Sequence, residues 1–495
     1  MLLGNYCGQR SSLARAILVS VFASILATSC GGGDGRGPAA STAAIDPATG
    51  LSLAATAGQA LFSDTSLSVS GRQSCGTCHV PQHAFAQDPA TDHGLPVPLG
   101  GPNMDQTGFR NTPSLMYASF TPPFSLDGGP VGGFFRDGRA SSLAAQAQQP
   151  FLTDFEMANQ TEGETIGRLQ NSPATLQAFV AAYGQAVLSD PHAAMQDVGL
   201  ALAAYETEDP DFHPFTSKFD YWQQGKATLS VDELAGLSLF NNPGKGNCTA
   251  CHPSQAQSFS THPLFTDFSF DNIGVPRNWQ IPANTPGAVS PISGAPLVTV
   301  APIDVPSDAG YAYYDMGLCG PLLPSANDVN ARADLSATTT LCGIFKVPTL
   351  RNIALTSPYF HNGIFTDLHQ VVEWYVTRDI NNNYDNNPTP VAAGAGGNPY
   401  QAIGTFYTAA DGSPDADQYN DLPVAYDANV NIVEVPYTPP TFAGGQAPTL
   451  TPQEIDQLVA FLCTLSDGFD PSDPGAYTVP SQCQPSAAQT ALANQ

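Results

Sequence analysis

Two short runs of the sequence combine residue types that can do redox chemistry. They are Cys75-Gly76-Thr77-Cys78-His79 and Cys248-Thr249-Ala250-Cys251-His252. In each run two residues separate the thiols, and a histidine directly follows the second thiol. With this spacing both thiols add to the two vinyl groups of one porphyrin, while the histidine faces the iron as its proximal ligand. We therefore expect two covalently bound haem c groups, one on each run.

The alternatives for these four thiols are a pair of redox disulfides or one zinc site, and neither would use the two histidines. The other cysteines fit an oxidising compartment. Cys319 and Cys342 bracket a loop, and Cys463 and Cys483 connect the last expected helix to the tail. We expect these to form two disulfides, although spacing alone does not prove the pairing.

The N-terminus, up to residue 29, has the order of a secretory signal. Arg10 and Arg15 precede an apolar run at 16–27 that is too short to span a bilayer comfortably, and small residues follow. Cys30 stands where a bacterial lipoprotein would carry its lipid anchor, and ordinary signal cleavage nearby is the alternative. We expect export to the periplasm, with residues 30–50 as a flexible tether.

The composition excludes several classes of partner. The 495 residues include 16 Lys and Arg against 43 Asp and Glu, a formal net charge of −27. Because no basic run offsets this charge, it argues against nucleic acid and against an anionic membrane surface as partners. The 45 glycines and 44 prolines predict much loop and turn, while 42% hydrophobic residues are enough to build a core.

Helices are expected to position the two haem runs. Apolar periodicity predicts short amphipathic helices at 164–169, 175–183 and 198–205. Ser230 and Thr451 each precede a Glu by three positions, which is the pattern of a capping box and predicts a helix start at each. The Pro-, Asn- and Gly-rich stretches in the C-terminal half are typical of loops.

A weak internal repeat precedes the two haem runs. Ala57-Gly58 and Leu61-Phe62 have the same spacing as Ala235-Gly236 and Leu239-Phe240, which suggests duplicated units. We therefore expect a mainly α fold with extensive loops and two cytochrome c-like haem domains. The expected domains span residues 51–225 and 226–470, and a tail follows at 471–495.

Beyond the haem runs, the chain resembles the bacterial di-haem cytochrome c peroxidase and MauG family over most of residues 51–470. The matching segments are Arg110-Asn111-Thr112-Pro113-Ser114, Asp137-Gly138-Arg139-Ala140, Pro150 with Glu156-Met157, Phe345 to Asn352, and Thr356 to Gly363. The resemblance implies an oxidoreductase that reduces hydrogen peroxide to water with electrons from a small redox protein or another donor. The N-terminal haem would react with peroxide and the C-terminal haem would relay electrons. The oligomeric state stays open, with a homodimer as one option.

For the N-terminal haem, with His79 as proximal ligand, the resemblance implies catalytic roles for Glu156 and Gln146. Heterolysis of a peroxide needs a group that takes one proton and returns it to the leaving oxygen. A carboxylate in a partly apolar pocket can have its pKa raised toward that task. His93 is a candidate distal ligand at rest and His83 a lesser one, while the alternative for both is a solvent-exposed loop histidine.

For the C-terminal haem, with His252 as proximal ligand, the family places the sixth ligand fourteen residues after the His of its P-Y-x-H-[DN]-G segment. Here that histidine is His361, and the count leads to Tyr375. A Met at this position would raise the reduction potential, whereas an oxygen donor would lower it. The alternatives are that Tyr375 is a core residue of a helix at 368–375, or that Met316 is the ligand.

The resemblance also implies a calcium ion between the domains, bound by the Asn111 side chain and by the backbone carbonyls of Thr356 and Pro358. The chain departs from the family at Arg136, where the family's W-D-G-R-A segment has a Trp placed between the haems. A guanidinium is not easily oxidised, which argues against a high-valent state shared between haems as in MauG. Two alternatives to a peroxidase stay open: a MauG-like di-haem oxidase acting on a protein or organic substrate, and a non-catalytic di-haem electron carrier.

Overall fold

The computed structural model describes most of the two expected domains. The described residues are 43–278, 280–281, 315–319, 338–378, 406–408, 414–416, 421–422, 424–437, 441–442, 445–446 and 448–483. The expected secretory signal, Cys30 and most of the expected tether lie outside these residues, as does the end of the expected tail. Within the described part of the chain, no helix is long and apolar enough to cross a membrane.

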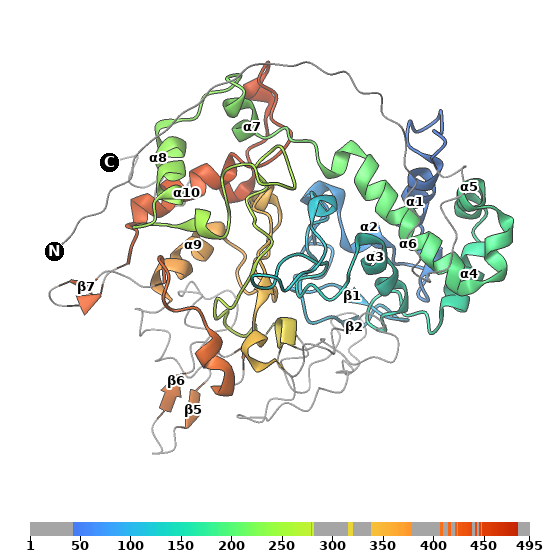
Figure 1. Ribbon diagram of the computed structural model, residues 1–495, viewed down its shortest axis with the longest axis horizontal. Coiled ribbons are helices and arrows are strands. Elements are labelled where there is room, and N and C mark those ends of the chain that lie inside the picture. Colours follow the sequence, from blue (N-terminus) through green and yellow to red (C-terminus); the bar gives the residue numbers. More distant parts are fainter. Residues whose placement is uncertain are drawn as a thin grey trace, which may run out of the picture. The chain divides into compact units, whose positions relative to one another are not determined.

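Helices dominate the described residues (Figure 1). In chain order they are α1 (Leu53–Ser63), α2 (Cys75–Cys78), α3 (Leu143–Leu152), α4 (Glu162–Gln170), α5 (Pro173–Tyr183), α6 (Pro191–Glu208), α7 (Lys218–Gln223), α8 (Val231–Asn241), α9 (Leu368–Thr377) and α10 (Pro452–Cys463). Long irregular segments and short 3₁₀ turns connect them. The expectation of a mainly α fold with extensive loops is confirmed.

The strands are two or three residues long and form separate antiparallel pairs. They are β1 (Leu99–Gly100) with β2 (Gln106–Thr107), β3 (Phe270–Asp271) with β4 (Phe345–Lys346), β5 (Phe406–Thr408) with β6 (Pro414–Ala416), and β7 (Thr441–Phe442) with β8 (Gly445–Gln446). In the β3–β4 pair, Phe270 lies opposite Lys346 and Asp271 opposite Phe345. This pair brings the segment after the second haem run beside the 345–352 segment.

The helices begin where their capping residues predict. At the start of α8, the Ser230 hydroxyl accepts a hydrogen bond from the Glu233 amide at 3.2 Å, and the Glu233 carboxylate accepts from the Ser230 amide at 2.6 Å. Thr451 and Glu454 form the same capping box at the start of α10. Helices α4, α5 and α6 contain the three amphipathic ranges expected in the N-terminal half.

Two hydrophobic cores organise the described residues, and each contains a close helix crossing at a glycine. In the first core α1 crosses α6, and a Cβ on Gly58 would lie 2.0 Å from the backbone oxygen of Ala201. In the second core α8 crosses α10, and a Cβ on Gly236 would lie 1.9 Å from the backbone oxygen of Gln457. Only glycine permits such approaches. The internal repeat therefore marks equivalent helix pairs in two lobes, while the domain boundary expected at residue 225 stays a prediction.

Buried polar contacts link the 345–363 segment to both lobes. The Arg351 guanidinium forms a two-pronged ion pair with the Asp220 carboxylate at 2.8 and 2.9 Å, and both side chains are fully buried. Asp467 accepts hydrogen bonds from Tyr117 of the first lobe and from Asn352, both at 2.7 Å. These contacts tie the long loop between β4 and α9 into a fixed position.

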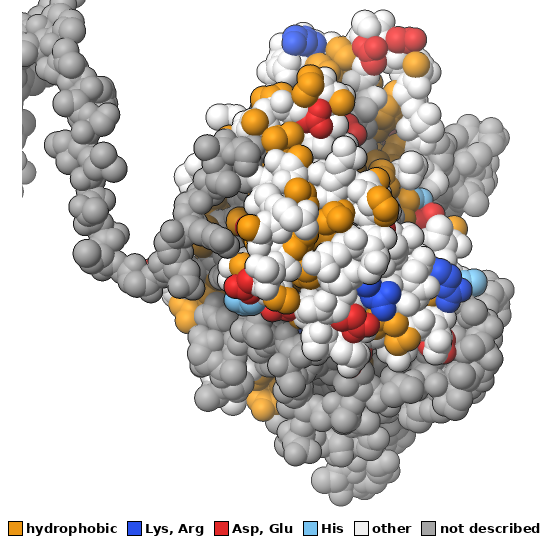
Figure 2. All heavy atoms as spheres, turned by 90° about the vertical axis from the view of Figure 1, so that its right-hand side faces the viewer, with side chains coloured by type: hydrophobic (Ala, Val, Ile, Leu, Met, Phe, Trp, Pro, Cys, Tyr) orange, Lys and Arg blue, Asp and Glu red, His pale blue; other side chains and the backbone are white. Residues whose placement is uncertain are grey.

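Figure 2 shows the molecular face on the side of α4 and α5. Charged side chains are sparse on this face and lie scattered among apolar and neutral polar groups. The acid excess of the sequence is therefore not gathered into one patch on this side of the molecule.

Candidate functional site

The two haem runs place their histidines in the same way. The run in the first lobe forms α2, and the second run forms a 3₁₀ turn at Cys248–Ala250. His79 Nδ1 lies 3.0 Å from the Phe85 carbonyl oxygen, and His252 Nδ1 lies 2.8 Å from the Phe265 carbonyl oxygen. Because a carbonyl only accepts, Nδ1 carries the proton in both rings and Nε2 is left to bind a metal.

The carbonyls that hold these rings come from strained backbone. Phe85 and Phe265 both have a φ of 53°, in the left-handed region that bulky residues rarely adopt. Such conformations cost of order 1–3 kcal/mol each and persist where the surrounding structure requires them. Burial lowers the pKa of His79 to about 4 and also lowers the pKa of His252. Both imidazoles are therefore neutral at pH 7, the form that ligates iron.

The four thiols of the two runs are free in the structure. Burial raises the pKa of each of them to about 12, so they are neutral thiols: Cys75, Cys78, Cys248 and Cys251. None of them pairs with another, which leaves all four available for thioether bonds. The structure thus gives no support to the alternative of two redox disulfides within the runs.

The expected disulfides lie elsewhere in the described residues. Cys319 is joined to Cys342, and Cys463 at the end of α10 is joined to Cys483. Both pairings expected from the sequence are confirmed. The second disulfide ties α10 to the segment that follows it.

One continuous cavity of about 510 Å³ is lined by both haem runs. Its walls are mostly apolar and come from both lobes and from the 345–361 segment. At each run, two thiols and an imidazole nitrogen face the same space, which is the donor set that covalent haem attachment requires. The residues at each run therefore fit one haem c group, which would be held by Cys75, Cys78 and His79 in the first lobe and by Cys248, Cys251 and His252 in the second.

Glu156 and Gln146, the predicted catalytic pair, both line this cavity. Gln146 lies on α3, and Glu156 follows this helix on a turn held at both ends. The Glu156 amide donates to the Thr153 carbonyl at 3.0 Å, and the Glu156 carbonyl accepts from the Gly101 amide at 2.8 Å. Burial raises the pKa of Glu156 to about 7, although the nearby Arg139 cation and a hydrogen bond from Thr153 lower it. The carboxyl can therefore both take and return a proton near neutral pH.

Three alternative ligands suggested by the sequence lie away from the cavity walls. His93 is exposed on a turn with a φ of 57°, and His83 lies 3.4 Å from the Asp88 carboxylate. Met316 packs in a small cluster around the Cys319–Cys342 disulfide. None of the three is among the residues that line the cavity described above.

Tyr375 on α9 lines the cavity near the second haem run. Burial and the two thiols of that run raise the pKa of its hydroxyl. Its ring stacks on Tyr437 with centroids 5.9 Å apart, and the Arg378 guanidinium lies 4.1 Å from the centre of the Tyr437 ring. Tyr437 also lines the cavity but comes from a Pro-rich segment, and sequence reasoning missed it because its position depends on tertiary packing.

Glu206 is a second cavity acid that sequence reasoning missed. It lies on α6, one turn after Leu202, and only 4% of its surface is exposed. One of its carboxylate oxygens has no hydrogen-bond partner, and burial raises its pKa to about 8. Its charge raises the pKa of Cys75, so it lies near the first haem run. A weak signal was present in the sequence, because Glu206 continues the four-residue spacing of the apolar Val198 and Leu202.

A buried cluster of basic side chains lines the cavity alongside the segments that resemble the family. Arg110 binds the Asp137 carboxylate at 2.9 Å and the Asp315 carboxylate at 2.6 Å, and Arg139 binds Asp137 at 3.0 Å. Lys346 donates to the Gly133 carbonyl, and burial lowers its pKa to about 7. Three guanidinium groups, counting Arg136, and the Lys346 amine thus lie near two carboxylates, and this excess of basic groups suits the propionates of a haem.

The residues of the predicted calcium site do meet in the structure. Asn111 and Thr356 line the cavity, and the Asn111 side-chain amide donates to the Pro358 carbonyl. The side-chain oxygen of Asn111 accepts a hydrogen bond from the Arg136 guanidinium. These oxygens therefore already have hydrogen-bond partners, and the calcium ion stays a prediction.

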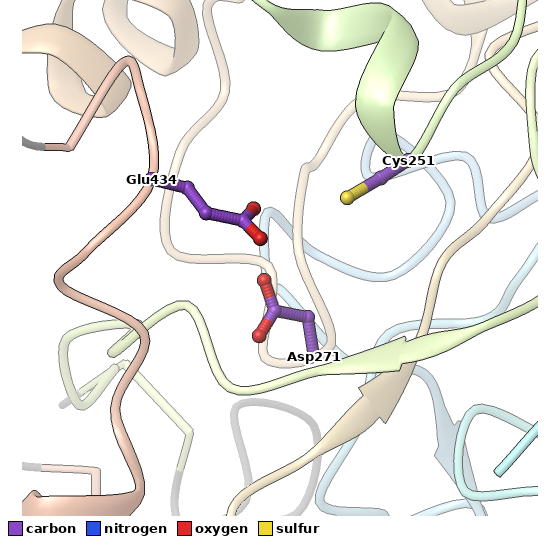
Figure 3. A group of neighbouring side chains, drawn as sticks. All are labelled: Cys251, Asp271 and Glu434. Carbon is purple, nitrogen blue, oxygen red and sulfur yellow. The ribbon is translucent and has the colours of Figure 1, made fainter. Parts of the chain in front are cut away.

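Two carboxylates lie beside the second haem run (Figure 3). Asp271 of β3 and Glu434 face each other, and single ligand atoms of these residues and of Cys251 lie within 4.8 Å of one another. Asp271 also accepts a hydrogen bond from Asn431 at 3.1 Å. Since haem attachment would consume the Cys251 thiol, we interpret the two acids as the rim of the haem site rather than as a metal centre.

Comparison with known proteins agrees with this geometry. Residues 53–228 match the family model of the di-haem cytochrome c peroxidases. The chain is 36% identical over 340 residues to the methylamine utilization protein MauG of Paracoccus denitrificans, covering 68% of this chain and 78% of that protein. It is 26% identical over 332 residues to the cytochrome c551 peroxidase of Nitrosomonas europaea, covering 66% of this chain and 74% of that protein.

A solved structure shows the same architecture. The crystal structure of the diheme peroxidase BthA from Burkholderia thailandensis superposes with a TM-score of 0.65 at 29% sequence identity, covering 90% of each chain. The similarity to MauG extends over enough of both sequences to establish the relationship, and the relatives named as peroxidases are oxidoreductases. The chain belongs to the di-haem cytochrome c peroxidase and MauG family.

Proposed function

We propose that the protein is an exported di-haem c-type peroxidase that reduces hydrogen peroxide to two molecules of water with two electrons and two protons. The electrons come from a small redox donor and pass through the C-terminal haem to the N-terminal haem. The observation that carries the proposal is the buried carboxyl of Glu156, which lines the cavity at the first haem run with a pKa of about 7. The bound haem supplies the site where peroxide binds and accepts electrons.

Glu156 moves the proton in this proposal. Its carboxylate would take a proton from one peroxide oxygen and return it to the other, which leaves as water. Gln146 lines the same cavity and can hydrogen-bond the peroxide without changing protonation state. The Arg139 guanidinium lowers the pKa of Glu156, which keeps part of the carboxyl ionised at pH 7. Burial and this cation together set a pKa at which the group works in both directions.

Near the second haem run the cavity is lined by tyrosine side chains, whereas an acid lines it near the first. Tyr375 and Tyr437 stack there on the side of the second haem run. In the sequence, Tyr375 stands fourteen residues after His361, where the resemblance implies the sixth ligand. We propose that Tyr375 ligates the second iron, which makes this site suited to electron relay rather than to peroxide binding. Export is part of the proposal and is supported by the leader-like N-terminus and by two disulfides.

A MauG-like oxidation of a protein or organic substrate is the second candidate. It is favoured by the 36% identity to a MauG and by Tyr375. Arg136 speaks against it, because the family's Trp between the haems is replaced by a side chain that does not relay an electron hole.

The test uses the holoprotein with its haem content measured first, and two haems per chain are expected. Wild type and Glu156→Gln are mixed with hydrogen peroxide and a reduced small cytochrome c, and donor oxidation is followed by absorbance. We expect rapid turnover for the wild type and strong loss for the variant. Unchanged turnover in Glu156→Gln would remove the role of Glu156. The absence of any peroxide reaction, with both irons six-coordinate in every redox state, would favour a pure electron carrier.

A further inference from the structure

The Arg136 guanidinium contacts Asn111, one of the three residues that the family resemblance implies as calcium ligands. It donates to the side-chain oxygen of Asn111, and its Nε donates to the Asn111 backbone carbonyl at 3.3 Å. The Asn111 amide nitrogen in turn donates to the Pro358 carbonyl. Two of the three oxygens expected to bind calcium are therefore already engaged, one of them by a cation that belongs to the protein.

The nearby carboxylates are not available to complete a calcium site. Calcium takes six to eight oxygen ligands and usually includes carboxylates among them. Asp137 and Asp315 are both bound by Arg110 at 2.6 to 2.9 Å. Asp421 accepts a hydrogen bond from Asn362 at 2.8 Å and lies 3.1 Å from His361 Nε2. A divalent ion beside Arg136 would also meet like charge in a buried setting, where repulsion is weakly screened.

The hydrogen bonds of Arg136 do the structural work that an interdomain ion would do. Through Asn111, the guanidinium is connected to Pro358, and the Asn111 amide donates to the His361 carbonyl at 2.9 Å. The Arg136 carbonyl accepts from the Lys346 amide at 2.8 Å. Arg136 thus joins the first lobe to two parts of the 345–363 segment, which lines the cavity near the second haem run.

We propose that Arg136 replaces the interdomain calcium ion, so that the holoprotein binds no calcium at Asn111 and Pro358 and needs none. Arg136 stands where the family has a Trp, and its guanidinium would supply the positive charge that a calcium ion would otherwise provide. This inference goes beyond the proposed peroxidase function, because it concerns which cation holds the lobes together and does not depend on the reaction.

The first test is the calcium content of the wild-type holoprotein. Protein purified in the presence of calcium and then dialysed is analysed by inductively coupled plasma mass spectrometry. Its thermal unfolding and haem absorption spectrum are compared in EGTA and in calcium chloride. We expect substoichiometric calcium, with the same melting temperature and spectrum in both buffers. One calcium per chain, or a melting temperature that falls in EGTA, would overturn the proposal.

Variants show whether Arg136 is responsible. Arg136→Gln frees the Asn111 oxygen and removes the competing charge, and Arg136→Trp restores the family residue, so each should bind one calcium per chain and be stabilised by it. Lys346→Met is the matched control, because it removes a cation of the same cluster that does not contact Asn111. A folded Arg136→Gln protein that binds no calcium, or equal binding by the control, would overturn the proposal. If the Arg136 variants do not fold, the wild-type calcium content still decides.

Discussion

The ionisation of Glu156 should set the pH dependence of peroxide reduction near neutrality. Burial raises its pKa to about 7 from an ordinary value of 4.5. A carboxyl with a pKa of about 7 is about 9% ionised at pH 6 and about 91% ionised at pH 8. Because the ionised form accepts the peroxide proton, kcat/KM for hydrogen peroxide should rise about tenfold between these pH values. A carboxyl with its ordinary pKa would already be about 97% ionised at pH 6, and the rate would not change.

Two substitutions separate this proton chemistry from a structural effect. Glu156→Gln keeps the size of the side chain but removes its acid–base function, so kcat/KM should fall by about 10²–10⁴ and the rise between pH 6 and 8 should disappear. Arg139→Met removes the cation that lowers the pKa of Glu156, so the rise should move to higher pH. Arg139→Lys keeps the charge and should leave the curve close to that of the wild type.

The assay is stopped-flow reaction of the holoprotein with hydrogen peroxide at pH values from 5 to 9, with haem content matched between variants. The reasoning is refuted by a wild-type rate that is flat between pH 6 and 8. It is also refuted by a Glu156→Gln variant that keeps the rise, since another group would then be accepting the proton. A curve for Arg139→Met that moves to lower pH would contradict the electrostatic coupling.

Three further perturbations test other parts of the structure. Gly236→Ala would place a Cβ 1.9 Å from the Gln457 backbone oxygen, so the free energy of unfolding measured in urea should fall by at least about 1–3 kcal/mol. The control is Gly167→Ala, where a Cβ meets open space and stability should be unchanged or higher. Tyr375→Met should raise the reduction potential of the second haem in a spectroelectrochemical titration, and an unchanged potential would exclude Tyr375 as its ligand. Burial raises the pKa of Glu206 to about 8, so between about pH 4.5 and 8 the folded protein holds a proton that the unfolded chain releases, and the free energy of unfolding should fall as pH rises from 5 to 8. In Glu206→Gln the free energy of unfolding should depend less steeply on pH. An equally steep pH dependence in the variant would contradict the raised pKa of Glu206.

Local features of this chain could be predicted from sequence because their chemistry is contained in a few consecutive residues. The haem runs specify their cofactor through spacing alone, and the structure brings their thiols and imidazoles to one cavity. Capping residues such as Ser230 and Thr451 satisfy helix-end amides within their own turn, so the helix starts follow from local sequence. The repeated Ala-Gly pair was visible as a pattern, although its reason, a helix crossing at Gly58 and Gly236, is tertiary.

The parts that sequence reasoning missed all depend on partners far away in the chain. From its residue type, Glu206 is expected on the solvent-exposed face of a helix. The packing of α6 against α1 and α3 instead places it beside the first haem run. Tyr437 comes from an irregular segment without periodicity, and its ring is placed by Tyr375 and Arg378. Arg136 was identified as a departure from the family, but its contact with Asn111 requires the loop at 110–114 to fold against it.

The two lobes differ less in how they hold a haem than in what they place around it. Both lobes hold the histidine of the haem run with a carbonyl from a phenylalanine at a φ of 53°, the same strained arrangement in each. The side chains that line the cavity differ between the two haem runs. The first lobe contributes Glu156 and Glu206, two acids whose pKa values burial brings to about 7 and about 8, whereas α9 contributes Tyr375 beside the second run. Proton-coupled reduction of peroxide needs groups that exchange protons near neutral pH, and electron relay needs none. These side chains, Glu156 and Glu206 in the first lobe and Tyr375 beside the second run, support the proposal that peroxide reacts in the first lobe.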